Sequence, residues 1–460
     1  MTESRMTLVA CVLAAGRGTR MRSDVPKVLQ PLAHKPLLGH VLEIVEALGA
    51  DDTVIVYGHG GDAVQSAFAS TDLKWALQAD QLGTGHALQQ AMPQIADNTR
   101  VLVLCGDVPL LTQASLQRLL ASTPDDAVGV LSVAMDDPTG YGRIIRDDHD
   151  SVIRIVEQKD GDANELAVRE INSGVFVLPS TPLRRWLDAL SPQNTQGEYY
   201  LTDVVGLAVA EGIAVHGVLA DSFEETMGIN DRVQLAAAER VYQTRVVEQL
   251  MRDGARVADP GRVDIRGDVR VGKDVFIDIN AVFEGEVMLE DGVHIGPNCV
   301  IRNATLGAGT QVHANSLIDD ATLGRACQIG PFARLRPGSQ LADKAKVGNF
   351  VEIKKAQIGK GSKVNHLTYI GDATIGEDVN VGAGTITCNY DGANKHQTVI
   401  GDGAFIGSGV ELVAPVEVGA GATIAAGSTI TRGAADGSLT VARARQKTIE
   451  GWQRPVKNKK

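Results

Sequence analysis

A six-residue period runs through the second half of the sequence, from about residue 263 until it fades after Arg432. An aliphatic residue followed by glycine recurs at this spacing, from Val271-Gly272 to Val418-Gly419. Such hexads predict a parallel β-helix, in which three short strands form one coil and aliphatic side chains stack along the axis. The region is long enough for roughly nine coils of about 18 residues. We expect the glycines at corners with a positive φ.

The period is interrupted once, between Val381 and Ile400. This segment contains Asn389-Tyr390-Asp391-Gly392, which is a turn signal. We therefore expect a loop that leaves the coil here, and such loops often gather on the binding face of a β-helix. After Arg432 the chain is expected to form an arm at the end of the prism.

The first half alternates strands and helices instead. Residues 8–13, 53–58 and 100–107 are short, apolar and rich in β-branched side chains, which predicts buried strands. Residues 36–48 have helical spacing. This order predicts a mostly parallel sheet with helices on both faces. Ligands bind such sheets beyond the carboxyl ends of the strands.

One amphipathic helix is predicted between the halves, over residues 231–252, with Gly254 as its C-cap. We expect it to pack on one domain through an apolar stripe that consists of Val233, Leu235, Val241, Val246 and Leu250. The predicted organisation is a first domain at residues 1–229, a connector helix at 230–254, and a β-helix with its arm at 255–460.

Charge and composition limit which binding partners and which cellular compartment are expected for this protein. The formal net charge of -12 argues against nucleic acid or an anionic membrane surface as the main partner. No apolar run approaches the ~20 residues that cross a bilayer, so no membrane insertion is expected. The five cysteines are scattered without a Cys-X-X-Cys pair, which favours reduced thiols and a cytoplasmic protein.

The first predicted strand leads into a loop of small residues, 13–16. Backbone N–H groups of such a loop hold phosphate oxygens, and the cations Arg20 and Lys27 suit a polyphosphate. The loop matches neither common phosphate pattern, because Met21 stands at the third dinucleotide glycine and no Gly-Lys-Ser/Thr follows. Asp107 ends the strand at 100–107, where a carboxylate is placed to hold Mg²⁺; a helix cap is the alternative.

Two features of the second half suggest chemistry. Several residues are spaced by multiples of 18 and are expected to line one edge of the prism: Arg336, Lys354, Tyr390, Ser408 and Ala426. A solvated row of surface side chains is the alternative. His366 precedes the ejected loop, and an imidazole suits removal of a proton from an attacking amine. A structural histidine is the alternative here.

Eight motifs of the first half occur in a specific order. They are LAAGRGTRM, VPKVL, QLGTGHA, CGDVPLL, GYGRI, VEQKD, INSGVF and GEYYLTD. Together they resemble the sugar-nucleotide pyrophosphorylases. With the β-helix, nearly the whole chain resembles the bacterial bifunctional members that join an N-acetylglucosamine-1-phosphate uridylyltransferase to a glucosamine-1-phosphate N-acetyltransferase. The resemblance implies a Rossmann-like α/β nucleotidyltransferase domain followed by a left-handed parallel β-helix. It also implies synthesis of UDP-N-acetylglucosamine for peptidoglycan and lipopolysaccharide.

For the first half, the resemblance implies UTP and N-acetylglucosamine 1-phosphate as substrates. Arg20 and Lys27 would act at the phosphates, and Asp107 and Asn230 would hold Mg²⁺. Cys105 departs from the tyrosine that is common in relatives. The residues implied in binding the nucleotide or the sugar nucleotide are Leu13, Ala14, Ala15, Gly16, Lys27, Gln78, Gly83, Thr84, Cys105, Gly106, Asp107, Gly142, Glu157, Asn172 and Asn230.

For the second half, the resemblance implies an acetyltransferase that uses acetyl-CoA. His366 would be the general base, with Glu352 orienting it. Glucosamine 1-phosphate would be bound by Arg336, Lys354, Tyr369 and Asn380, and acetyl-CoA by Ala383, Asn389, Tyr390, Ser408, Ala426 and Arg443. Relatives are homotrimers with sites shared between neighbouring prisms.

Two other functions fit part of the sequence. A pyrophosphorylase with a purely structural or regulatory β-helix would not need the motifs HLTYIGD and CNYDGANK. A non-catalytic assembly subunit would be expected to have lost Arg20, Lys27 and Asp107, and all three are present.

Overall fold

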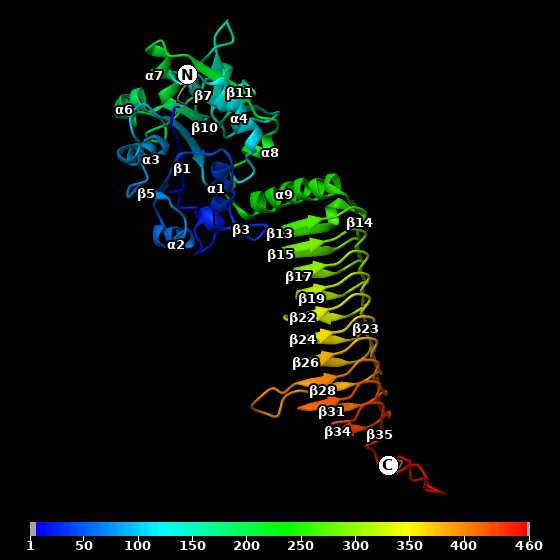
Figure 1. Ribbon diagram of the computed structural model, residues 1–460. Helices are drawn as coiled ribbons and strands as arrows, with labels where there is room; N and C mark the ends of the chain where they lie inside the picture. The colour runs from blue at the N-terminus through cyan, green and yellow to red at the C-terminus, as the bar shows by residue number, and fades with distance from the viewer. Residues whose placement is uncertain (1–5, 458–460) are drawn as a thin grey trace, which may run out of the picture. The chain divides into compact units, whose positions relative to one another are not determined.

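The computed structural model describes residues 6–457, which form two compact units (Figure 1). The first unit extends to Tyr242 and the second begins at Gln243. Each unit has its own hydrophobic core.

The first unit is built on one sheet with the strand order β11-β7-β10-β6-β1-β4-β5. Its central strands β1, β4, β5 and β6 pair in parallel, and β10 pairs antiparallel with β6 and β7. The three predicted strands are confirmed to within two residues at each end. The strands are β1 (Leu8–Leu13), β4 (Asp52–Tyr57), β5 (Lys74–Leu77), β6 (Arg100–Cys105), β7 (Val128–Ala134), β10 (Glu170–Pro179) and β11 (Val215–Leu219), with the β8 (Arg143–Arg146) and β9 (Val152–Val156) hairpin beside β10.

Helices cover both faces of this sheet, as the alternating side chains of β1 require. Leu8, Ala10 and Val12 belong to the core under α1 and α4, whereas Val9 and Cys11 belong to the core under α3, α6 and α7. The helices are α1 (Leu37–Ala47), α2 (Gly61–Ala67), α3 (Thr84–Ala91), α4 (Gln113–Ser122), α5 (Ala163–Leu166), α6 (Ser180–Ala189), α7 (Asp203–Ala210) and α8 (Phe223–Thr226). Short segments add η1 (Thr19–Met21), η2 (Lys27–Leu29), β2 (Pro31–Leu32), β3 (Lys35–Pro36) and η3 (Met92–Gln94).

The connector helix α9 spans Arg232–Asp253 and belongs partly to each unit. In the first unit, Leu235, Ala238 and Val241 pack with a small core around Leu32 and Leu37. In the second unit, its last turns join the core of the β-helix through Val246, Val247 and Leu250. The expectation of packing on one domain is therefore wrong, and Val233, expected in the stripe, is 79% exposed.

The second unit is a parallel β-helix (Figure 1). One side is an 11-stranded sheet, and nine of its strands, from β14 to β33, fall within residues 263–432, so the nine coils expected there are confirmed. The first and last strands, β12 and β35, lie outside the region in which the repeat was predicted. This sheet contains β12 (Ala255–Val257), β14 (Val275–Ile277), β16 (His294–Ile295), β18 (Gln311–Val312), β20 (Gln328–Ile329), β23 (Lys346–Asn349), β25 (Lys363–His366), β27 (Asn380–Val381), β30 (Phe405–Ile406), β33 (Thr423–Ile424) and β35 (Leu439–Thr440).

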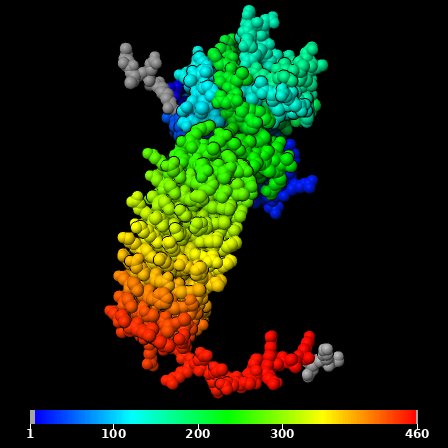
Figure 2. Space-filling model, turned by 90° about the vertical axis from the view of Figure 1, so that its right-hand side faces the viewer, coloured from blue at the N-terminus to red at the C-terminus, as the bar shows by residue number. Residues whose placement is uncertain are grey.

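The other sides form a 13-stranded sheet that bends around a corner. It contains β13 (Val263–Val271), β15 (Ala281–Leu289), β17 (Val300–Leu306), β19 (Leu317–Leu323), β21 (Arg334–Leu335), β22 (Ser339–Leu341), β24 (Glu352–Ile358), β26 (Tyr369–Ile375), β28 (Ile386–Cys388), β29 (Thr398–Ile400), β31 (Glu411–Val413), β32 (Val416–Val418) and β34 (Thr429–Ile430), after η4 (Pro260–Arg262). The predicted loop leaves the stack between β28 and β29 (Figure 1). Beyond β35, residues 441–457 are mostly exposed and extend from the end of the prism (Figure 2).

Coil length is not constant. The coil that runs from Ile295 to its strand partner Val312 is one residue shorter than the coil from Ile329 to its partner Val347. The coil with the ejected loop is much longer, because Val381 pairs with Ile406 on its far side. A fixed spacing of 18 therefore does not follow one edge, and the expected single column is not formed. Arg336 follows a strand of the 13-stranded sheet, whereas Ser408 follows a strand of the 11-stranded sheet.

With one exception, the glycines of the aliphatic-glycine pairs do not form the corners with a positive φ that were expected of them. Within the described prism, only Gly330 of these pairs has a positive φ, 86°. The left-handed corners are formed elsewhere, often by asparagine or aspartate such as Asn298 (φ 59°) and Asp378 (φ 52°), which tolerate this region. The paired glycines instead allow close approach of coils, because a Cβ on Gly348 would lie 2.0 Å from Asn365 O.

Gly359→Ala tests this close approach. An added Cβ would lie 2.1 Å from Gly376 O in the next coil, so the two backbones must separate. We expect the free energy of unfolding of the β-helix, measured in urea, to fall by about 1–3 kcal/mol. Gly433→Ala is the matched control, because its Cβ would stay 3.4 Å from the nearest atom, Glu417 O. Equal losses in the two variants would contradict the explanation.

Candidate active sites

A pocket of about 270 Å³ lies at the carboxyl ends of the parallel strands in the first unit. The loop after β1 and the end of β6 meet there because β1 and β6 pair in parallel, Leu13 beside Cys105. Ten of the predicted residues line it: Leu13, Ala14, Ala15, Gly16, Lys27, Gln78, Gly83, Thr84, Cys105 and Asp107. Arg20 is exposed on η1 and does not line this pocket, and neither does Gly106, whose backbone N–H donates to Leu13 O at 2.9 Å.

The far wall of this pocket is held by amide side chains. Gln78 Nε2 donates to Gly83 O at 3.0 Å, and Gln81 Nε2 donates to Ala15 O at 2.8 Å. Gly83 has a φ of 112°, and a Cβ there would lie 2.6 Å from Tyr199 O. Gln81 was missed from the sequence, although it opens the motif QLGTGHA. Its hydrogen bond to Ala15 O links the loop after β5 to the loop at residues 13–16.

Lys27, Asp107 and Asn230 form a three-way contact at the edge of this pocket. The Lys27 ammonium contacts the Asp107 carboxylate and lies 3.2 Å from Asn230 Oδ1. The side chains of Lys27 and Asp107 are 12% and 18% exposed. Ile229 N donates to Asp107 O at 2.9 Å, which holds the two segments together. Two hard oxygen ligands thus converge on one cation, as a site for Mg²⁺ requires.

Other ligands for a metal are scarce nearby. Among residues 6–457, no group of three or more histidine, cysteine, aspartate or glutamate side chains is placed to hold a metal ion. A cation held by Asp107 and Asn230 would therefore need ligands from a substrate or from water. Burial raises the pKa of the Cys105 thiol to about 12, with Asp107 adding to the shift and Lys27 opposing it. The thiol is therefore protonated at neutral pH and is no nucleophile.

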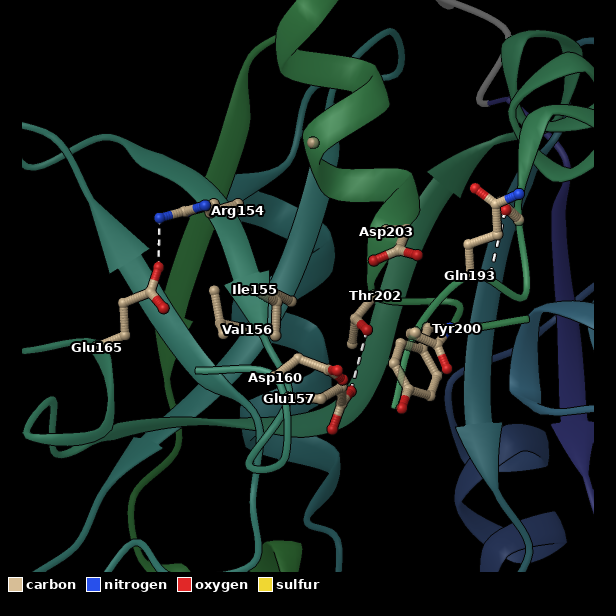
Figure 3. A pocket seen from close by; sticks show the side chains of 13 residues that line it. Arg154, Ile155, Val156, Glu157, Asp160, Glu165, Gln193, Tyr200, Thr202 and Asp203 are labelled. Atoms are coloured by element: carbon tan, nitrogen blue, oxygen red, sulfur yellow. Dashed lines mark hydrogen bonds and ion pairs between the residues drawn. The ribbon is translucent and has the colours of Figure 1, made fainter. Parts of the chain in front are cut away.

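A second pocket of about 550 Å³ adjoins the predicted sugar residues (Figure 3). Thr202 Oγ1 donates to Glu157 Oε1 at 3.0 Å, and a Cβ on Gly142 would lie 3.4 Å from the same oxygen. Asn172 N donates to Gly142 O at 2.9 Å. The structure thus brings the three predicted residues Gly142, Glu157 and Asn172 together.

This second pocket is acidic. Burial raises the pKa of Glu157, and the charges of Asp203, Asp160 and Glu198 add to the shift. Burial, with Asp160 second, also raises the pKa of Asp203. Glu165 at the rim differs, because it pairs with Arg154 (Figure 3).

In the second unit, His366 ends β25 on the surface of the prism. The strand pairing places Asn349 beside it one coil earlier, and the ring Nδ1 lies 3.0 Å from Asn349 Oδ1. An amide oxygen can only accept, so Nδ1 carries the proton and Nε2 is left as the basic nitrogen. Glu352, expected to orient His366, instead pairs with Arg336 at 2.7 Å. Asn349 was missed because its contact depends on a coil that is shorter than the expected repeat.

Three cations gather on the neighbouring side of the prism. The nearby Lys395 is the main cause that lowers the pKa of the Lys354 ammonium, and the charge of Arg336 adds to the shift. Lys395 stands on the ejected loop, where Tyr390 and Lys395 pair in a short antiparallel bridge. Asp391 ties the loop together, since N–H groups of Ala393 and Asn394 and the His396 ring bond to its carboxylate. We name Arg336, Lys354 and Lys395 the cation cluster.

The remaining predicted residues divide into three places. Ala383, Ser408 and Ala426 stack on one edge, linked by Gly409 N donating to Ala383 O and Gly427 N donating to Ser408 O, and Arg443 donates to Ala426 O. Tyr369 and Asn389 lie together, with Asn389 Nδ2 3.5 Å from the Tyr369 hydroxyl, whereas Tyr390 on the loop is 60% exposed. Asn380 lies between Lys363 and Phe405 on the 11-stranded sheet, apart from the cation cluster on the other sheet.

Known proteins resemble this chain along nearly its whole length. Residues 10–170 match the MobA-like NTP transferase domain, residues 265–358 the GMPPB C-terminal domain, and residues 397–432 six repeats of the bacterial transferase hexapeptide. The protein named bifunctional protein GlmU of Azoarcus sp. (strain BH72) is 54% identical over 97% of this chain and 99% of its own. That of Alkalilimnicola ehrlichii is 57% identical over 98% of this chain and 97% of its own. The chain belongs to the bifunctional GlmU family.

Membership in the GlmU family confirms the predicted fold class, a nucleotidyltransferase domain followed by a left-handed β-helix. It also confirms a bifunctional enzyme of UDP-N-acetylglucosamine synthesis, with uridylyltransferase and acetyltransferase activities and with UTP and acetyl-CoA as substrates. A solved UDP-glucose pyrophosphorylase complexed with UDP-glucose is 17% identical, covers 52% of this chain and 100% of its own, and has a TM-score of 0.44. No helix within residues 6–457 is long and apolar enough to cross a membrane.

The raised pKa of Glu157 predicts how stability changes with pH. Burial makes its ionisation costly in the folded protein, so this cost grows as the pH rises above the carboxyl's ordinary value of 4.5. Glu157→Gln should therefore raise the melting temperature by a few degrees at pH 7.5, and the gain should vanish as the pH falls below 4.5. Fluorimetric melting between pH 4 and 8 measures this. Glu165→Gln, which loses the Arg154 pair, should bring no gain; a gain in Glu165→Gln alone would contradict the assignment.

Proposed function

We propose that the strand-end pocket of the first unit is the uridylyltransferase site. A phosphate oxygen of N-acetylglucosamine 1-phosphate attacks the α-phosphorus of UTP, a new P–O bond forms, and pyrophosphate leaves with the electrons of the broken bond. No protein nucleophile takes part, so positioning and charge stabilisation accelerate the reaction. The loop 13–16 holds phosphates, and Gln78, Gly83 and Thr84 contact the uracil. The convergence of these residues on one pocket supports this assignment.

The sugar and the metal have places beside this pocket in the proposal. Gly142, Glu157 and Asn172 bind the N-acetylglucosamine ring, and the exposed Arg20 reaches the departing phosphates from η1. Asp107 and Asn230 hold Mg²⁺, which, when bound, neutralises charge on phosphate oxygens. Their shared contact with the Lys27 ammonium supports this, because both oxygens point toward one positive charge.

We propose that His366 is the general base of acetyl transfer. Its Nε2 removes a proton from the 2-amino group of glucosamine 1-phosphate as the nitrogen attacks the thioester carbonyl of acetyl-CoA; the C–S bond breaks and CoA leaves as a thiol. Asn349 fixes the tautomer through Nδ1. The cation cluster binds the sugar phosphate, and Tyr369 contacts the sugar. Asn389, first assigned to acetyl-CoA, is assigned to the sugar instead because its amide lies beside the Tyr369 hydroxyl.

Acetyl-CoA lies along the edge of Ala383, Ser408 and Ala426 in this proposal, with Arg443 and Tyr390 assisting. Asn380 stands apart from the cation cluster in one chain, so it contributes to the sugar site of a neighbouring copy in a homotrimer. A stacked pair of aromatic rings, Phe332 and Phe350, is 49% and 56% exposed on the prism and supports such an assembly. The free thiols of all five cysteines support a cytoplasmic enzyme.

Crossed substitutions separate the two sites. His366→Ala should lower acetyl transfer by about 10²–10⁴-fold and leave uridylyl transfer unchanged. Asp107→Ala should do the reverse. The two rates are measured separately, as CoA release and as pyrophosphate release, so each variant is the folding control for the other. Near wild-type acetylation in His366→Ala would show that the base lies elsewhere, and full formation of UDP-N-acetylglucosamine without acetyl-CoA or without UTP would contradict the bifunctional scheme.

Lys395→Ala tests the cation cluster. Loss of one charge-assisted contact to phosphate should raise KM for glucosamine 1-phosphate about tenfold, with a smaller change in kcat. Steady-state kinetics with acetyl-CoA in excess measures both. Lys360→Ala, which changes a lysine at a turn of the same prism, is the matched control. An unchanged KM in Lys395→Ala would place the phosphate elsewhere.

A further inference from the structure

The Lys27 ammonium occupies the point on which the proposed metal ligands converge. It contacts the Asp107 carboxylate, and Asn230 Oδ1 lies 3.2 Å away. Asn230 is oriented for this contact, because its Nδ2 lies 3.3 Å from Gly228 O and its backbone N–H donates to Gln234 Oε1 at 2.7 Å. Both oxygens therefore point at one positive charge in the protein alone.

The stem of the Lys27 side chain packs against Gly18, and the residue also lines the strand-end pocket. Gly18 packs so closely on the stem that a Cβ there would lie 2.6 Å from Lys27 Cβ. Lys27 lines the nucleotide pocket together with Gly16, and an added Cβ on Gly16 would meet nothing within 4 Å. Because Lys27 lines this pocket, rotation about its four-carbon stem would carry the ammonium from Asp107 toward a ligand bound there.

An ammonium and a divalent cation cannot share these two ligands. Two positive charges about 4 Å apart repel each other strongly at a partly buried site, where water screens them poorly. Removal of the lysine leaves the Asp107 carboxylate without its cation. Metal affinity of the free protein is thus set by competition with an internal charge as well as by the ligands.

We infer that Lys27 is a built-in counter-ion that occupies the divalent-cation site until nucleotide binds, and that it then moves to the phosphates as the metal takes Asp107 and Asn230. This inference rests on the proposed uridylyltransferase site, and it adds the order in which Lys27, nucleotide and metal exchange partners there. Metal alone binds weakly to the free protein because it must displace Lys27. Nucleotide phosphates accept the ammonium, so metal and nucleotide bind cooperatively.

Titration of the nucleotide-free full chain with Mn²⁺ alone, by calorimetry, tests the competition. Lys27→Met keeps the length of the side chain and removes its charge, and the Kd for Mn²⁺ should fall about tenfold or more relative to the wild type. Lys35→Met, which removes a more exposed lysine that pairs with Glu43, is the matched control and should not change the Kd. Adding Asp107→Asn to Lys27→Met should abolish the gain. An unchanged or higher Kd in Lys27→Met would overturn the inference.

A measurement on the wild type guards against a misfolded variant. Mass spectrometry after brief reductive methylation reports how accessible each lysine amine is. Mn²⁺ without nucleotide should raise methylation of Lys27 several-fold, whereas Lys35 should not respond; an unchanged Lys27 would also overturn the inference. Neither measurement contains UTP or sugar, so both are independent of the pyrophosphate assay. Failure of the proposed uridylyltransferase function and failure of the Lys27 competition can therefore be told apart.

Discussion

Parallel strand pairing determines where the functional groups of this protein lie. In the first unit, β1 and β6 are parallel neighbours, so the loop after Leu13 and the residues after Cys105 leave the sheet at the same edge. In the second unit, the same type of pairing stacks residues of successive coils, and Asn349 comes to lie beside His366. In both units the register of the strand hydrogen bonds brings together groups that are distant in sequence. This register therefore decides which side chains meet in each candidate site.

The β-helix combines this regular register with one interruption. The ejected loop lengthens a single coil, yet the stack resumes beyond it with Val381 beside Ile406. The loop is held by hydrogen bonds to Asp391, whose pKa they lower, and by Asn389, whose amide donates to Asp372 at 2.5 Å. These contacts hold the loop in the conformation that places Lys395 near Lys354. In the proposed acetyltransferase site, a phosphate dianion would offset the charge of these side chains.

Local patterns predict the elements well, and distant contacts limit what they predict about the sites. The strands of the first unit and the β-helix follow from periodicity, because burial of aliphatic side chains leaves a local signature. Coil length does not follow from periodicity, because coils that differ by one residue keep the same aliphatic pattern. The expected column of Arg336, Lys354 and Ser408 is therefore split between two sheets. The paired glycines were expected at left-handed corners. Their actual role is to leave room for the backbone of the next coil, and a local sequence pattern does not show which residues that coil places beside them.

The same limit explains the residues that were missed. Glu352 was expected to orient His366 because the family resemblance implied it, but the pairing of β21 with β24 places it within reach of Arg336. Lys395 lies in a motif that already suggested binding, yet its proximity to Lys354 depends on the conformation of the loop. In the first unit, Lys27 and Asp107 were both expected at the phosphates as separate groups. Their contact with each other gives each charged group a counter-charge in the free protein, and in the proposed site substrate and metal would have to replace it.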